Sequence, residues 1–486
     1  MIFQINKVTL DGVEYELAQP TTGRKNLISV MTGKNGAGKS RILEFIASNF
    51  LVSDNFLMEH PENWSKRFNA ITLDYSNNQV QYQTGTTECS MQRIEARMAS
   101  VFKTPEYIEN RHDVFPRKLI CLSTSPFDRF PLNSSKTAHS NSIYSYIGMK
   151  NSKRSSSVVS LISNVLDSMF KVPENIESNV EVIKKTLSYL GYGNRILVSY
   201  RSNFKLDFNN LSRANVSEML KKKDTPLFDK YLINERGWEQ SIDDIYRNIK
   251  TLTSSSNKWK TTYSVPINLS KTNLLEDSYI KAIQVLSQNN LFSIKSLKLS
   301  RADDNRKFVD FTSASSGEQC LALMLLGIAS QIEDGSLICI DEPEISLHPE
   351  WQEEFIPLLE SLFSNYTGCH FLIATHSPLL ISKLTGSNCY ILDLDENKLF
   401  NTLERYNYSS DYKLATLFKS PGFKNEYLIN ESLDILNTLS KPGDIGREVL
   451  DRSMTLISLK EKLEDEDPVY SLITTIERVL EAINND

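Results

Sequence analysis

The spacing of hydrophobic and polar positions along the chain predicts an α/β protein. Short apolar runs of strand length end at glycine-rich or acidic turns, and longer segments repeat apolar residues every three or four positions. An initial hairpin is predicted at 1–17, with Asp11-Gly12 as its turn. The other predicted strands are 26–31, 70–75, 79–82, 118–123, 196–200, 291–299, 308–311, 337–340, 370–374 and 388–394. Helical spacing occurs in 41–50, 158–170, 176–190, 205–255, 317–332, 351–362 and much of the chain from 410 onward, whereas 134–157 is rich in Ser, Asn and Lys and is expected to be loop-like.

A glycine-rich loop joins the predicted strand 26–31 to the predicted helix 41–50. Its residues are Gly33, Lys34, Asn35, Gly36, Ala37, Gly38, Lys39 and Ser40, which satisfy G-x-x-x-x-G-K-[ST] in the strand–helix context that this motif requires. Glycines let backbone N–H groups approach phosphates, and the helix directs its positive end at them. We predict that these eight residues bind ATP, that Lys39 contacts the β- and γ-phosphates, and that Ser40 is a ligand of Mg²⁺.

Two further groups of polar residues follow strand-like runs. Asp341 and Glu342 end the run 337–340, where Asp341 is suited to hold Mg²⁺ and Glu342 to polarise the water that attacks the γ-phosphate. His376 follows the strand 370–374 and is expected to bridge the γ-phosphate and that water. We therefore predict Glu342 and His376 as catalytic residues. A capping histidine at a strand–helix turn is the alternative for His376.

The loop after the strand 118–123 carries a third candidate for the metal site. Asp128 lies in Ser125-Pro126-Phe127-Asp128-Arg129-Phe130, a polar loop at the end of a predicted strand. Asp128 or Ser125 is expected to sense Mg²⁺ and water there, since no glutamine is present in this loop. The alternative is that Asp128 pairs with Arg129 or Arg117.

Composition and charge narrow the protein class further. A net charge of −6 with 40% hydrophobic residues is typical of a folded soluble protein, and no run of about 18 apolar residues predicts a membrane span. The first residues lack a signal-peptide core, and the six cysteines form no C-x-x-C pair, which excludes a zinc hook and favours a cytoplasmic protein. Small basic clusters such as Lys221-Lys222-Lys223 are expected to be solvated helix faces, with a nucleic-acid groove as the alternative.

The motifs in their order resemble the ABC-type ATPases of the SMC, RecF and OLD group. The ordered set is GKNGAGKS, SPFDRF, SSGEQ, ICIDEPEISLHP and IATHSP. Such a resemblance implies an ABC-type P-loop ATPase core with a mixed central sheet and an antiparallel β lobe. It also implies that Ser316, Gly317 and Glu318 of the SSGEQ signature contact ATP held by another subunit, so that the chain acts as a dimer or larger assembly.

Within that group, the chain looks most like the PtuA-like ATPases of Septu anti-phage systems, which also accompany some retrons. The likeness lies in the loop 124–130, in Tyr146-Ile147-Gly148 and in the segment 420–428. It implies a separately encoded HNH nuclease as the partner that the ATPase regulates. A retron reverse transcriptase with its nucleic acid is a further candidate partner, and contact with DNA or RNA is compatible with the resemblance.

The expected organisation has four parts. Residues 1–133 and 291–400 are assigned to the two halves of the ATPase core, 134–290 to a compact, mainly helical insertion, and 401–486 to a helical C-terminal region that offers a partner or oligomer surface.

Three other functions compete with this interpretation. The first is a DNA-repair or chromosome-maintenance ATPase that acts directly on DNA. An intrinsic nuclease is not expected, because the D-x-D of Asp393-Leu394-Asp395 falls in a strand of the ATPase core and only a helical tail follows it. A transporter ATPase is disfavoured by SSGEQ, since transporter subunits usually carry LSGGQ.

Overall fold

The computed structural model describes most of the chain. The described residues are 2–21, 23–59, 78–84, 87–94, 99–103, 115–132, 142–148, 150, 176–203, 212–221, 235–253, 261–270, 278–289, 291–384, 386–402, 415, 421–440 and 446–485. The predicted strand 70–75 and the predicted helix 158–170 lie outside them.

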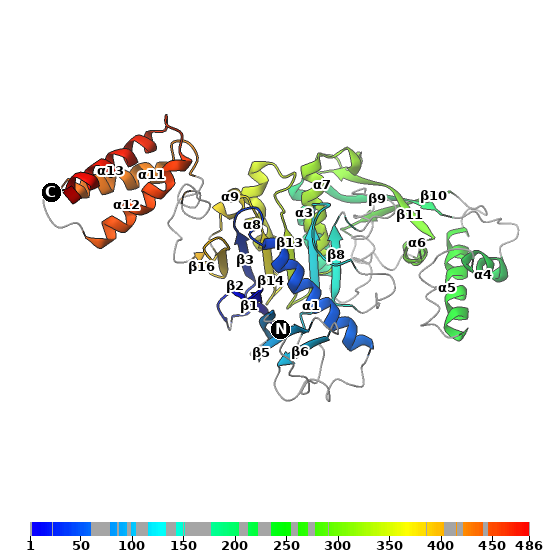
Figure 1. Ribbon diagram of the computed structural model, residues 1–486. Helices are drawn as coiled ribbons and strands as arrows, with labels where there is room; N and C mark the ends of the chain where they lie inside the picture. Colours follow the sequence, from blue (N-terminus) through cyan, green and yellow to red (C-terminus); the bar gives the residue numbers. More distant parts are fainter. Residues whose placement is uncertain are drawn as a thin grey trace.

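Strands and helices are mixed through the first four hundred residues, and the described elements beyond β16 are all helical (Figure 1). The strands are β1 (Phe3–Leu10), β2 (Val13–Glu16), β3 (Leu27–Thr32), β4 (Gln79–Thr84), β5 (Thr87–Ile94), β6 (Ala99–Lys103), β7 (Leu119–Ser123), β8 (Tyr144–Gly148), β9 (Tyr192–Ser202), β10 (Thr262–Asn268), β11 (Phe292–Arg301), β12 (Phe308–Asp310), β13 (Leu337–Asp341), β14 (His370–Ala374), β15 (Cys389–Asp393) and β16 (Lys398–Asn401). The helices are α1 (Lys39–Glu59), α3 (Ile176–Tyr189), α4 (Arg213–Lys221), α5 (Glu235–Thr253), α6 (Ser278–Gln288), α7 (Ser316–Ala329), α8 (Pro349–Leu362), α9 (Pro378–Ser382), α11 (Glu426–Leu439), α12 (Arg447–Leu459) and α13 (Pro468–Asn485), with short 3₁₀ turns at η7 (Phe311–Ser313) and η9 (Lys460–Lys462).

The central sheet has seven strands in the order β16-β15-β3-β14-β13-β7-β8. Its strands are parallel from β15 to β8, and only β16 at the edge runs antiparallel. Successive residues of β13 illustrate why the strands are apolar throughout. Ile338 and Ile340 enter the core on one face, whereas Leu337 and Cys339 enter the core on the other. A parallel sheet covered on both faces requires such continuous apolar runs.

A five-stranded antiparallel sheet, β2-β1-β4-β5-β6, forms the β lobe on the side of α1. The predicted hairpin is confirmed: Leu10 pairs with Val13, and Asp11 and Gly12 both have positive φ, as a two-residue hairpin turn requires. Phe3, Phe50 and Tyr82 pack edge to face between the lobe and α1. The sequence did not predict β5 and β6, because their mixed polar residues give no clear alternation.

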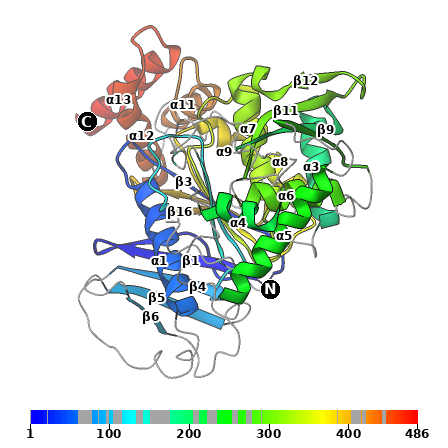
Figure 2. The same ribbon diagram turned by 90° about the vertical axis from the view of Figure 1, so that its right-hand side faces the viewer.

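A third sheet, β10-β9-β11-β12, is antiparallel and extends away from the core; we call it the arm sheet (Figures 1 and 2). Helix α3 contacts β9 and helix α6 contacts β11, while α5 packs against both α4 and α6. The described part of 134–290 contains helices α3–α6 and the strands β8, β9 and β10, of which β9 includes the predicted strand 196–200. Pro266 obscured β10, because proline disfavours a central strand, and in the structure β10 is the edge strand.

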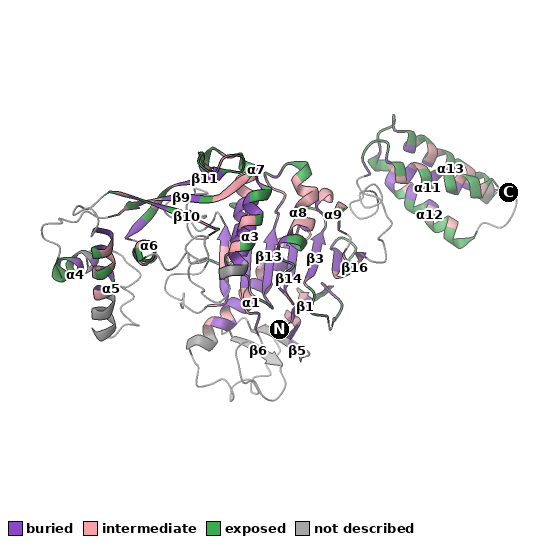
Figure 3. Ribbon diagram, turned by 180° about the vertical axis from the view of Figure 1, so that it is seen from behind, coloured by how far each residue is buried: buried purple, intermediate pink, exposed green. Residues whose placement is uncertain are grey.

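The helices α11, α12 and α13 form a separate bundle with its own hydrophobic core, which includes Leu428, Ile435, Leu456, Ile473 and Ile476. In Figure 1 it stands apart from the central sheet, and Figure 3 marks both buried and exposed residues along its helices. The helices predicted for the C-terminal region are therefore present. Among the described helices, none combines the length and the hydrophobicity needed to cross a bilayer.

One buried histidine joins the β lobe to the central sheet. The side chain of His370 is fully buried; its Nδ1 accepts from the Ile5 backbone N–H at 3.0 Å, and its Nε2 lies 2.9 Å from Ser29 Oγ. Because Ile5 supplies a donor, Nδ1 carries no proton, and Nε2–H donates to Ser29, whose hydroxyl donates to the Leu17 carbonyl. Burial lowers the pKa of His370 to about 3, so the imidazole is neutral in the folded protein.

This network predicts acid sensitivity. The unfolded chain protonates His370 below its ordinary pKa of 6.5, whereas the folded chain does so only near 3. Its contribution to stability is therefore complete above pH 6.5 and is lost as the pH falls toward 3, by up to about 1.4 kcal/mol per pH unit. His370→Asn is expected to be less stable at pH 8 and to show a flatter dependence of unfolding free energy on pH in denaturant titrations.

The matched control is His348→Asn, which replaces an exposed histidine. It should keep the pH dependence of the parent protein. Parallel curves for the parent and His370→Asn would show that His370 does not govern the acid response.

Candidate functional site

The glycine-rich loop spans the gap between β3 and α1 in a conformation that needs its glycines. Gly33, Gly36 and Gly38 all have positive φ, at 146°, 86° and 103°. At Gly33 space is limiting as well, because a Cβ there would lie 3.1 Å from the Ala37 Cβ. The first turn is held by Asp395, whose carboxylate oxygens accept from the Lys34 backbone N–H at 3.2 and 3.3 Å. The loop is therefore shaped before any phosphate arrives.

Lys39 begins α1 and is almost completely buried. Its ammonium donates to the carbonyls of Gly33 at 2.6 Å and Lys34 at 3.1 Å. Burial lowers its pKa, and the charges of Glu342, Asp395 and other carboxylates oppose that shift. A buried cation that is bound only by loop carbonyls is well placed to exchange them for phosphate oxygens.

Ser40 in the first turn of α1 contacts Asp341 at the end of β13: the Ser40 hydroxyl donates to Asp341 Oδ1 at 2.9 Å. Burial, chiefly, raises the pKa of Asp341 to about 7; the charge of Glu342 adds to the shift, and the hydrogen bond from Ser40 opposes it. A hydroxyl and a carboxylate are hard oxygen ligands of the kind that Mg²⁺ prefers. A divalent cation here would also stabilise the ionised form of Asp341, so the two residues fit the predicted metal site.

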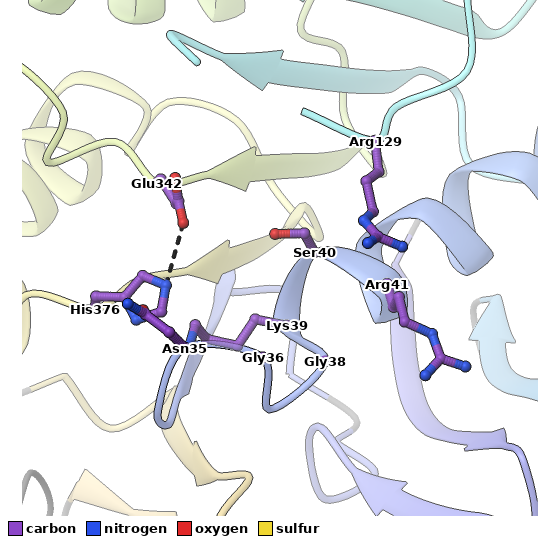
Figure 4. Close-up of a pocket in the computed structure, with 9 residues that line it drawn as sticks. All are labelled: Asn35, Gly36, Gly38, Lys39, Ser40, Arg41, Arg129, Glu342 and His376. Atoms are coloured by element: carbon purple, nitrogen blue, oxygen red, sulfur yellow. Dashed lines mark ion pairs between the residues drawn. The ribbon is translucent and has the colours of Figure 1, made fainter. Parts of the chain in front are cut away.

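Glu342 and His376 face each other at the mouth of the site (Figure 4). His376 Nε2 lies 3.1 Å from Glu342 Oε1, and both side chains are partly exposed. Glu342 has a φ of 50°, and its N–H donates to the Ala374 carbonyl at 2.9 Å, which ties the end of β13 to the end of β14. Both side chains line a cavity of about 340 Å³ whose lining residues are Asn35, Gly36, Gly38, Lys39, Ser40, Arg41, Arg129, Glu342 and His376.

Glu344, which the sequence did not suggest, positions His376. Its Oε1 accepts from the His376 backbone N–H at 2.6 Å, and burial raises its pKa. The hydroxyl of Ser377, which follows His376, donates to Gln352 Oε1 of α8 at 2.6 Å. In the sequence, only its place two positions after Glu342 marked Glu344 as a possible site residue.

Two arginines of the cavity also escaped prediction. Arg41 follows the glycine-rich loop and pairs with Asp11 of the β1–β2 turn. Arg129 lies 3.7 Å from Glu44 of α1 and is more than half exposed. Both ion pairs are exposed, so neither guanidinium is tied to a buried partner. Sequence reasoning passed over them because isolated arginines carry no motif.

Asp128 is buried close enough to Asp341 for its charge to raise the Asp341 pKa. Its two oxygens are engaged elsewhere: Oδ1 accepts from the Phe130 N–H at 3.0 Å, and Oδ2 accepts from the Tyr146 hydroxyl at 2.5 Å. It does not line the cavity, and the ion pair of Arg129 is with Glu44. A role for Asp128 as a metal ligand remains a prediction that requires this loop to rearrange.

The signature begins α7, away from the cavity that Lys39 and Glu342 line. Ser315 and Glu318 form a capping box: the Glu318 carboxylate accepts from the Ser315 N–H at 2.7 Å, and the Ser315 hydroxyl accepts from the Glu318 N–H at 3.2 Å. Ser316 is exposed, and Gly317 is buried against Ser346 and Trp351. Ser316, Gly317 and Glu318 therefore do not contribute to the phosphate cavity of their own chain.

Because Lys39 is a buried cation in the phosphate loop, we expect its replacement to weaken nucleotide binding without destabilising the nucleotide-free protein. Lys39→Met should lower nucleotide affinity about a hundredfold or more, because charge-assisted hydrogen bonds to phosphate are lost. The thermal midpoint of the nucleotide-free protein should stay the same or rise, since a buried cation is removed. Lys185→Met removes an exposed lysine of α3, which does not line the cavity, and is the control. Equal losses of affinity in both variants would contradict the assignment.

Comparison with known proteins agrees with this geometry. Residues 195–382 match the family model described as "AAA domain, putative AbiEii toxin, Type IV TA system". The chain is 25% identical over 289 residues to the Retron Ec83 probable ATPase of Escherichia coli, covering 52% of this chain and 49% of that protein. It is 24% identical over 251 residues to the Retron Vc95 probable ATPase of Vibrio cholerae serotype O1 biovar El Tor, covering 44% and 45%. The chain thus spans about half the length of the curated relatives it matches.

Among solved structures, a Smc head domain with an extended coiled coil, bound to the C-terminal domain of ScpA and derived from Pyrococcus furiosus, aligns with 11% identity and a TM-score of 0.32. It covers 90% of this chain and all of that chain. A TM-score this low does not establish a shared fold. The sequence matches support an ATPase: residues 195–382 are similar to an AAA domain, and the chain is similar to two retron probable ATPases.

Proposed function

We propose that the protein binds Mg²⁺–ATP and hydrolyses it within an assembly of two or more copies. The observation that carries this proposal is that the signature residues lie apart from the other predicted ATP-binding and catalytic residues of the same chain. Lys39, Ser40, Asp341, Glu342 and His376 converge at the ends of adjacent strands, whereas Ser316 and Gly317 lie on another surface. In ABC-type ATPases the signature of one subunit closes the nucleotide of its neighbour, and the exposed start of α7 is available for that contact.

The proposed residue roles follow from the contacts. Lys39 and the loop N–H groups hold the phosphates, and Mg²⁺, when bound, offsets phosphate charge between Ser40 and Asp341. Glu342 accepts a proton from the attacking water and orients it, while His376 keeps the Glu342 carboxylate in place at 3.1 Å. The Glu344 carboxylate fixes the backbone of His376.

Glu342→Gln is the test of this mechanism. The amide keeps the shape of the side chain but cannot act as a base, so ATP affinity should be retained and turnover should fall by about a hundredfold or more. Trapped ATP should also hold two copies together, which native mass measurement detects. Turnover equal to that of the parent protein would remove Glu342 from this role.

A second substitution separates assembly from binding. A Cβ at Gly317 would lie 2.8 Å from the Ser346 carbonyl oxygen and 3.0 Å from the Trp351 ring, so Gly317→Ala must displace the start of α7. Added to Glu342→Gln, it should abolish the ATP-held assembly and leave monomer affinity within about threefold, because Gly317 is outside the cavity. An assembly that persists would contradict the signature contact.

We further propose that this ATPase regulates a separately encoded HNH nuclease in an anti-phage defence system of the Septu or retron-associated kind. Support comes from the similarity to two retron ATPases and from the motifs shared with Septu-type ATPases. The bundle α11–α13, which has its own core, is the candidate docking unit.

Co-expression tests the nuclease proposal. The chain and the product of an adjacent HNH reading frame should purify together and give one mass in native measurement, and Glu342→Gln should change DNA cleavage by the complex. Two separate masses, with cleavage independent of Glu342, would contradict it.

A further inference from the structure

The two faces of the arm sheet differ in chemistry. One face is apolar: Ile196, Val198 and Tyr200 of β9 are buried, and helices α3 and α6 lie against this sheet. In Figures 1 and 2 the helices α4, α5 and α6 all lie on one side of the sheet. The alternate residues of β9, β10 and β11 form the opposite surface, which we call the outer face.

Four cations lie on the outer face. Arg195 and Arg201 are exposed on β9, and Lys295 and Lys298 are exposed on the neighbouring strand β11, where Lys295 occupies a bulge. Within the described part of the chain none of the four makes an ion pair, whereas Arg301 at the end of β11 is bound to Asp303. Four neighbouring exposed cations give this surface a positive potential that attracts anions.

Among the described residues, one carboxylate lies near this group. Asp310 of β12 lies opposite Lys298 in the ladder. Asp310 Oδ1 accepts from the Thr312 N–H at 3.0 Å and from the Thr312 hydroxyl at 2.7 Å, as the cap of the following turn. These bonds orient the carboxylate but leave its negative charge, so Asp310 offsets part of the charge of Lys298. One carboxylate against four cations leaves this group with a net positive charge.

The dimensions of the outer face match a phosphate backbone. Arg195 and Arg201 are about 20 Å apart along β9, and β11 runs about 5 Å to its side. Between the cations stand serines, of which Ser296 pairs with Ser199 and Ser199 Oγ lies 3.0 Å from Ser264 Oγ. Arginine, lysine and serine side chains are the usual contacts to nucleic-acid phosphates.

We propose that the outer face of the arm sheet binds the phosphate backbone of a nucleic-acid duplex. A single strand is usually held by aromatic side chains that stack on its bases, and the solvent-facing positions of β9, β10 and β11 carry none. A membrane surface is disfavoured because no large hydrophobic residue is exposed on these strands. Charge with hydroxyls but without rings suits backbone recognition.

This surface is joined covalently to the signature. β12 leads through η7 directly into α7, and the Gln319 side chain donates to the carbonyls of Phe311, Thr312 and Ala314 along that connection. The inference goes beyond the proposed function and does not rest on it, because binding to the outer face requires neither hydrolysis nor assembly.

The test is a binding titration without nucleotide. The full chain and a variant carrying R195Q, R201Q, K295Q and K298Q are titrated against fluorescent DNA and RNA duplexes of about 20 base pairs at several salt concentrations. The parent should bind at least one duplex. The variant should lose about tenfold or more in affinity. The slope of log affinity against log salt should fall by up to about 3.6, since each of the four phosphate contacts contributes about 0.9.

A matched variant with K185Q, K281Q, R447Q and R478Q removes four exposed cations on α3, α6, α12 and α13 and should keep affinity and slope. Equal losses in the two variants would overturn the proposal, as would failure of the parent to bind either duplex. So would tighter binding to a single strand of the same length, or charge-dependent binding to phosphatidylserine vesicles alone. Retained circular dichroism spectra and melting in both variants separate loss of contact from loss of fold.

Discussion

The parallel register of β3, β14, β13 and β7 is the constraint on which the site depends. Asp341 pairs with Ala374 on one side and with Ser123 on the other, and Ala374 pairs with Met31 at the mouth of the glycine-rich loop. The four strands, which are distant in sequence, therefore have their carboxyl ends side by side at one edge of the sheet. A slip of one residue would exchange the inward residues of both cores, so the packing that stabilises the sheet also aligns the chemistry.

Much of this arrangement could be predicted because its signals are local. The glycine-rich loop, Asp341, Glu342 and His376 each follow an apolar strand, and parallel strands bring their carboxyl ends together. Arg129, Glu344 and the bond between Tyr146 and Asp128 could not be predicted, because they depend on which loops pack side by side. β10 was missed for a similar reason: its pairing with β9 spans a long stretch of chain, and Pro266 weakens the local pattern.

Negatively charged side chains outnumber positively charged ones on the side of the cavity next to the central sheet. Asp341, Glu342 and Glu344 lie in sequence around one buried ammonium, and the raised pKa of Asp341 and of Glu344 reflects burial above all. Opposite them, Arg41 and Arg129 are held only by exposed pairs, which are weak. The site is thus suited to an anion that arrives together with a cation, as Mg²⁺–ATP does.

The contact of Gly317 with Ser346 has a consequence for communication. Ser346 is four residues beyond Glu342, and a Cβ at Gly317 would lie 2.8 Å from the Ser346 carbonyl oxygen. If a neighbour's nucleotide contacts the start of α7 as proposed, the contact of Gly317 with Ser346 links it to the turn that follows Glu342. By thermodynamic reciprocity, any change that this link makes in the chain's affinity for its own ATP must equal the change that its own ATP makes in its affinity for the neighbour's nucleotide.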